Sequence, residues 1–180
     1  PTSAQVMDTT DADDEYFKIR GDLVMKQPNT AVNWNVGSTQ DIIFTTTGSI
    51  AKVKLEYSIV GGGIGNYPSS PTLPSNPIAT GVTPVVGGDK TVSWTIPDAL
   101  TTQARVRVVD ENDATVYDES NVNFTIRDVL TFDAGTFTAG ENLYVYDPTL
   151  SPTKKTINWS KVGSVSTVKL EYSVDGGAYQ

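Results

Sequence analysis

An internal repeat constrains the fold of this chain more than any other feature of its sequence. Residues 48–58 read GSIAKVKLEYS and residues 163–173 read GSVSTVKLEYS, so eight of eleven positions are identical at a spacing of 115. A pair of glycines follows each copy at the same distance. Self-similarity at a fixed spacing is typical of tandem structural units. We therefore expect the same unit to occur more than once along the chain.

Alternating apolar and polar residues predict short β-strands that each bury one face. The alternation is found in residues 42–44, 52–59, 91–96, 104–109 and 122–126. The side chains expected to point inward are Ile42, Phe44, Val53, Leu55, Tyr57, Ile59, Val92, Trp94, Ile96, Ala104, Val106, Val108, Val122, Phe124 and Ile126. Residues 60–89 are rich in Gly, Pro and Ser, which predicts a long loop with one edge strand near Ile78. Six or seven such antiparallel strands predict an all-β, two-sheet sandwich.

A second pairing indicates where one unit ends and the next begins. Residues 16–21, YFKIRG, resemble residues 123–128, NFTIRD, at a spacing of 107, and a Leu-containing stretch follows each of them. The two spacings differ by eight residues. We attribute the difference to an insertion at residues 147–153, DPTLSPT.

The two pairings divide the chain into three parts. We expect residues 1–20 to contain the final strand of one module, residues 21–127 to form a complete module, and residues 128–180 to form the N-terminal part of a third. An incomplete sandwich cannot cover its own apolar face. Either the natural chain continues or another segment completes the third part.

Composition excludes several classes of function. The net charge is −8 and no basic run occurs, which argues against nucleic acid as a partner, because affinity for phosphates depends on clustered Lys and Arg. Cys and His are absent, so disulfides, imidazole metal sites and nucleophiles activated by His cannot form within the chain. No apolar run approaches the ~20 residues that cross a bilayer, so we expect no membrane-spanning segment.

Charged residues follow the pattern of a sheet surface and not that of a catalytic site. Lys54, Glu56, Arg105 and Arg107 are expected to point outward on neighbouring strands, as ordinary cross-strand pairs. The carboxylates show no spacing typical of a general acid–base pair. We therefore expect no enzymatic activity in this chain.

Several motifs resemble one family of repeats. Residues 34–44, WNVGSTQDIIF, resemble the opening W-x-x-G-S-x-x-x-I-x-W of bacterial immunoglobulin-like tandem repeats. The VKLEYS stretches with their following glycines resemble the hairpin of the same repeats. Residues 92–98, VSWTIPD, resemble their Y-x-W-x-I-P-D, and residues 105–108, RVRV, their closing hairpin. The resemblance implies tandem immunoglobulin-like, Greek-key β-sandwich modules.

Such repeats occur in large cell-surface, adhesin, sheath and surface-layer proteins. The resemblance therefore implies a structural segment of an extracellular surface protein, with neighbouring modules or further copies of itself as partners. The alternative is an adhesin or a carbohydrate-binding accessory module, which an exposed row of aromatic residues would favour. Trp34, Trp94 and Trp159 are expected to lie in the core instead of forming a sugar platform.

An acidic stretch after residue 109 raises two interpretations. Asp110, Asn112, Asp113 and Asp118 could bind calcium, because hard cations take six to eight oxygen ligands. The alternative, which we favour, is a polar turn between two strands. A second acidic run, at residues 11–15, is interpreted as a solvated terminus. The Arg-Gly-Asp tripeptide at residues 20–22 is interpreted as a bend between modules and not as an adhesion motif.

Overall fold

A computed structural model describes residues 18–67, 77–137, 155–173 and 176–180. In these residues the fold is all-β, as predicted, with one short 3-10 turn, η1 (Ile64–Asn66), and no α-helix. The strands are β1 (Asp22–Gln27), β2 (Asn33–Asn35), β3 (Thr39–Thr47), β4 (Val53–Ser58), β5 (Pro77–Val82), β6 (Asp89–Thr95), β7 (Thr101–Asp110), β8 (Tyr117–Glu119), β9 (Phe124–Arg127), β10 (Val129–Phe132) and β11 (Trp159–Val162).

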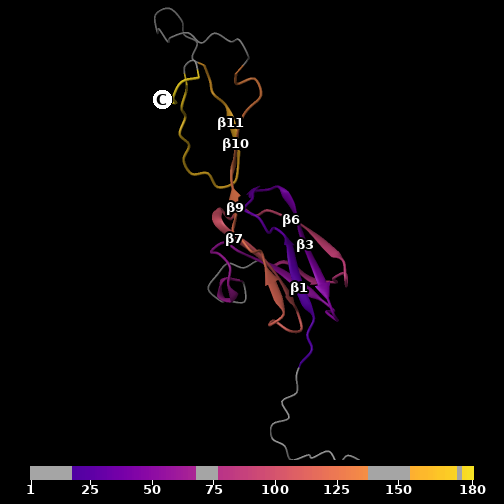
Figure 1. The fold of residues 1–180 in the computed structure, drawn as a ribbon. Helices are drawn as coiled ribbons and strands as arrows, with labels where there is room; N and C mark the ends of the chain where they lie inside the picture. The colour runs from indigo at the N-terminus through magenta and orange to yellow at the C-terminus, as the bar shows by residue number, and fades with distance from the viewer. Residues whose placement is uncertain (1–17, 68–76, 138–154, 174–175) are drawn as a thin grey trace, which may run out of the picture.

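The strands between β1 and β9 form two sheets. One has the order β1-β3-β6, and the other has the order β2-β9-β7-β4-β5, with β8 pairing to β7. All of these pairings are antiparallel except β2 with β9, which is parallel. The chain enters this body at the β1 end and leaves it at the opposite end, where β9 continues into β10 and β11 (Figure 1).

Both sheets contribute to one hydrophobic core. The prediction that Leu55, Trp94 and Phe124 point inward is confirmed, because all three are buried. The Trp34 ring lies 4.6 Å from the Phe124 ring and 6.1 Å from the Trp94 ring, centroid to centroid. Such offset and edge contacts between large rings add to the stabilisation from burial alone. The edge strand expected near Ile78 is β5.

Val122 was predicted to point inward but is exposed, because β9 begins only at Phe124. Just before this strand, the Asn121 amide donates a hydrogen bond of 2.6 Å to Oδ1 of Asn29. The short strand β8 was not predicted, since residues 117–119 show no apolar alternation.

Strands β10 and β11 pair in the same register as β1 and β3. Leu23 faces Thr46 and Met25 faces Phe44 in the first pair. Leu130 faces Lys161 and Phe132 faces Trp159 in the second. Every β10 residue lies 107 positions after its β1 counterpart, and every β11 residue lies 115 positions after its β3 counterpart. These are the two spacings of the sequence repeat, and they place the eight extra residues between β10 and β11.

The two VKLEYS stretches differ in structure. The first is β4, which pairs with β5 and β7, whereas residues 168–173 belong to no strand in the described part of the chain. Backbone N–H and C=O groups of a strand need partners in a ladder. In the described residues, no counterpart of β5 or β7 pairs with residues 168–173, and Tyr172 instead exchanges two backbone hydrogen bonds with Gln180.

Candidate interaction surfaces

The residues considered for calcium lie in the turn between β7 and β8. The Asp110 carboxylate accepts a hydrogen bond of 2.9 Å from the Asn112 amide, and the Asp113 carboxylate accepts one of 3.1 Å from the Thr115 amide. The Asp118 carboxylate is turned away from this turn and accepts a hydrogen bond of 2.7 Å from the Met25 amide in β1. No group of three or more potential metal ligands occurs in the part of the chain that the structure describes.

The bonds that Asp110 and Asp113 accept from amides two residues further on are the pattern of Asx turns, in which the side chain satisfies the local backbone. The geometry therefore gives the acidic residues a structural explanation, and calcium binding stays a prediction. The acidic run at residues 11–15 lies outside the described residues.

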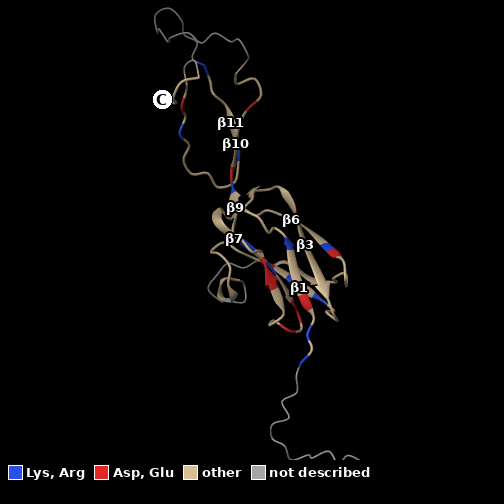
Figure 2. Ribbon diagram, viewed as in Figure 1, with Lys and Arg blue, Asp and Glu red and all other residues tan. Residues whose placement is uncertain are grey.

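Asp113 also anchors the segment that leads into β1. Its carboxylate lies 2.6 Å from the Lys18 ammonium and 3.4 Å from Nε of Arg20. The hydrogen bonds from Lys18 and Thr115 hold the pKa of Asp113 well below its usual range, and the charge of Arg20 acts in the same direction. Basic residues of the entering segment lie beside acidic residues at this end of the body (Figure 2). The arginine of the Arg-Gly-Asp tripeptide therefore has an intramolecular partner.

The other end of the body contacts the segment that contains β11. The Asp98 carboxylate accepts hydrogen bonds from the amide of Ser164, at 3.2 Å, and from the Ser164 hydroxyl. Val162 packs near Gly37, where an added Cβ would lie 3.4 Å from Val162 Cγ1. The 36–38 and 96–98 loops that make these contacts are joined by a hydrogen bond from the Gly37 amide to the Ile96 carbonyl.

A buried group of charged and aromatic side chains lies on the outer face of β4 and β7. Glu56 and Arg107 face each other across the two strands, and their carboxylate and guanidinium lie 2.6 Å apart. Both residues point outward on neighbouring strands, as predicted, but they are buried, because the Tyr67 side chain covers them. The Arg107 guanidinium lies 4.2 Å from the centroid of the Tyr67 ring, a cation–π contact.

Glu119 in β8 fixes the covering loop in place. Its carboxylate accepts a hydrogen bond of 2.8 Å from the Tyr67 hydroxyl and one of 3.1 Å from the Gly63 amide. Burial raises the pKa of Tyr67, and the hydrogen bond to Glu119 raises it further. The first part of the predicted 60–89 loop is thus an ordered cover over a buried ion pair, while residues 68–76 lie outside the described residues.

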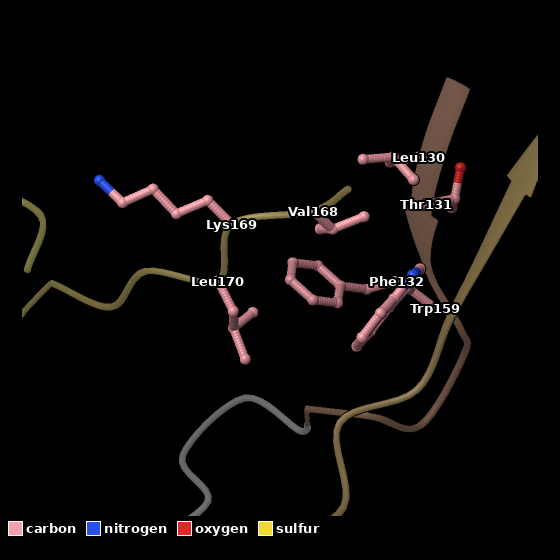
Figure 3. A pocket seen from close by; sticks show the side chains of 7 residues that line it. All are labelled: Leu130, Thr131, Phe132, Trp159, Val168, Lys169 and Leu170. Atoms are coloured by element: carbon pink, nitrogen blue, oxygen red, sulfur yellow. The ribbon is translucent and has the colours of Figure 1, made fainter. Parts of the chain in front are cut away.

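An apolar hollow of about 200 Å³ lies beside β10 and β11. Its lining residues are Leu130, Thr131, Phe132, Trp159, Val168, Lys169 and Leu170. Figure 3 shows the Phe132 and Trp159 rings side by side with Val168 next to them, whereas the Lys169 side chain extends away. Trp159 is 44% exposed, so the expectation that it lies in a core is wrong for the described structure. Its repeat counterpart, Phe44, is fully buried. The hollow therefore lies on the face of β10 and β11 whose counterpart, on β1 and β3, is covered in the first copy of the repeat.

No protein-family model matches this chain, and a search of curated proteins found no match. In the described residues, no helix is long and apolar enough to cross a membrane.

Proposed function

We propose that this chain is a structural, non-catalytic repeat segment of an extracellular surface protein. Its immunoglobulin-like sandwich modules would act as the building units of a surface layer, sheath, filament or spacer array. The observation that carries the proposal is the identical register of β1–β3 and β10–β11 at the two spacings of the repeat. A repeated pairing in one chain supports a string of similar units, which is an architecture for holding distance and not for chemistry.

The two ends of the central body also support this proposal. At one end, Lys18 and Arg20 bind Asp113, and at the other, Ser164 binds Asp98. Each end therefore fixes the segment that enters or leaves it. In such arrays, stability is local to each unit, with additional terms between nearest neighbours.

Imaging of the native material tests the proposal. We expect electron micrographs of the protein in its host to show an ordered lattice, a filament or strings of small domains at the cell surface. Isolated compact particles inside the cell would contradict it. The purified full chain should also show no hydrolase activity on a panel of glycan, ester and peptide substrates.

A carbohydrate-binding accessory module is the second candidate. It is favoured by Phe132 and Trp159, which face each other across β10 and β11 and are 54% and 44% exposed. Aromatic rings at a surface can stack on sugars, but the counterparts of these two residues, Met25 and Phe44, belong to a core. A glycan array separates the two candidates: specific binding that is lost in W159A would support the accessory module.

A further inference from the structure

In the described residues, the turn after β11 is hydrogen-bonded to the end of the central body. The Asp98 carboxylate receives both the amide and the hydroxyl of Ser164. The hydrogen bond from the Ser164 amide fixes the backbone of the turn after β11. The hydrogen bond from the Ser164 hydroxyl makes the contact selective for Ser or Thr. Hydrogen bonds to an ionised acceptor are stronger than neutral ones, so a single carboxylate suits this position.

The turn that binds Asp98 has a counterpart at the opposite end of the central body. Val162, Gly163 and Ser164 correspond to Thr47, Gly48 and Ser49 at the spacing of 115. We call the latter three residues the Gly48 corner. Both glycines have a positive φ, 103° for Gly163 and 81° for Gly48. The backbone therefore turns in a similar way at both places, in a conformation that favours glycine.

The Gly48 corner is open in this chain. Its three residues are exposed. In the described part of the chain, neither the amide nor the hydroxyl of Ser49 has a hydrogen-bond partner. Gly48 packs against Gly21, where an added Cβ would lie 3.0 Å from Gly21 Cα, whereas its counterpart Gly163 packs against Asp128.

We propose that the Gly48 corner is a docking site for the Asp98 loop, residues 96–98, of a preceding copy of this repeat. The Asp98 carboxylate of that copy binds the Ser49 amide and hydroxyl, and its Gly37 lies against Thr47. This inference rests on the proposed function and names the partner of each unit. The docking surfaces at the two ends are different, so the contact is heterologous and propagates as an open linear array.

The segment that enters the body agrees with this placement. Residues 16–20 correspond to residues 123–127, which contain β9 of the central body. A preceding unit would therefore join Gly21 through the same short connection that joins β9 to β10. Asp113 holds Lys18 and Arg20 of that connection. The Gly48 corner and the Asp113 turn would then form the end of each unit that binds the preceding unit.

Thiol crosslinking in a duplicated chain tests the proposal, because the natural chain has no Cys. Inserting a second copy of residues 21–127 directly after Arg127 keeps every native connection and adds one new junction. The cysteines are placed beside the contact, so that Asp98, Ser49 and Ser164 are kept. The test pair is S38C in the first copy with T47C in the second, because Ser38 follows Gly37, which lies against Val162, the counterpart of Thr47. The unduplicated full chain with S38C and V162C is the reference. The control is S38C with T47C in the same copy, where the two residues lie at opposite ends of β3.

We expect a short bismaleimide to crosslink the test pair as fast as the reference pair, and at least ~10-fold faster than the control pair, because a held contact raises the effective concentration. Crosslinking of the test pair at the control rate, with a fast reference pair, would overturn the docking site and leave the proposed function standing. Slow crosslinking of the reference pair would overturn the junction itself. An unchanged circular dichroism spectrum per unit shows that each variant is folded.

Discussion

Leu55 and Leu170 occupy the same position of the repeat but differ in burial. Leu55 is 0% exposed and Leu170 is 51% exposed. Deleting buried methyl groups removes transfer free energy and leaves a cavity, so L55A should lower the free energy of unfolding by about 2–5 kcal/mol. L170A is the matched control and should change it by less than about 0.5 kcal/mol. Urea denaturation of the full chain measures both, and equal losses would contradict the described burial.

The ion pair between Glu56 and Arg107 gives a second prediction at this scale. Removing one partner of a buried pair leaves the other charge uncompensated, so E56Q should destabilise the protein by about 3–5 kcal/mol. Lys54 also pairs with Glu56, at 2.9 Å, but its side chain is more exposed. K54M should therefore cost no more than about 1 kcal/mol, as for other exposed ion pairs. A similar cost for both variants, measured by urea denaturation, would show that the Tyr67 cover does not exclude water.

The sequence predicts the burial of a side chain well where alternation alone decides it. It predicts burial poorly where a segment distant in the sequence covers the side chain. Phe124 and Ile126 alternate with polar neighbours and are buried in β9. Glu56 alternates in the same way on the polar side of β4, yet it is buried. The cover comes from Tyr67, in a Gly- and Pro-rich stretch whose path has no periodicity to read. The alternation predicts to which face of the sheet a side chain points. It does not predict whether a loop folds back over that face.

At the scale of elements, the strands were more predictable than their partners. The alternation located β4, β6, β7 and β9. The repeat predicted an insertion at residues 147–153, which lie between β10 and β11 but outside the described residues. Which strands pair is determined by contacts between residues far apart in the sequence, and a single sequence carries little information about such contacts. For this reason the parallel pairing of β2 with β9 and the short strand β8 were not predicted. The contact of Asp98 with Ser164 was missed as well, since the two residues are 66 positions apart.

The anchoring of the entering segment should depend on pH. The pKa of Asp113 is lowered in the folded protein, so this carboxylate stabilises the anchored state at pH values above its unfolded pKa of ~4. The contribution is lost as the pH falls below that value toward the lowered pKa, because protonation removes the charge that binds Lys18 and Arg20. We therefore expect the segment to become mobile as the pH falls.

Backbone ¹⁵N relaxation of residues 18–20 between pH 6 and pH 2 measures this transition. D113N is the control, since it should give a mobile segment at every pH. D110N removes a neighbouring carboxylate that does not contact the segment and should retain the transition. A wild-type segment that is equally ordered at pH 6 and pH 2 would contradict the assignment of Asp113 as its anchor.

At the scale of the whole molecule, the stability of the central body and its orientation toward the next unit should be separable. The core lies between the two sheets, whereas Asp98 is in an exposed loop at one end. D98A removes two hydrogen bonds of the junction and no core contact, so the free energy of unfolding of the central body should change by less than about 0.5 kcal/mol. The angle between the body and β10–β11 should instead become variable.

Urea denaturation measures the free energy of unfolding, and residual dipolar couplings of the full chain measure the orientation of β10–β11 relative to the central body. In the wild type, one alignment tensor should fit β3, β7 and β10 together, whereas in D98A the β10–β11 pair should need its own, smaller tensor. S164A should behave like D98A, and S49A, which removes the same hydroxyl at the open corner, should behave like the wild type. If S49A loosens the pair as much as S164A does, the effect arises inside the central body and not at its junction. A string of units whose folds are rigid and whose junctions each depend on one carboxylate would combine local stability with adjustable curvature.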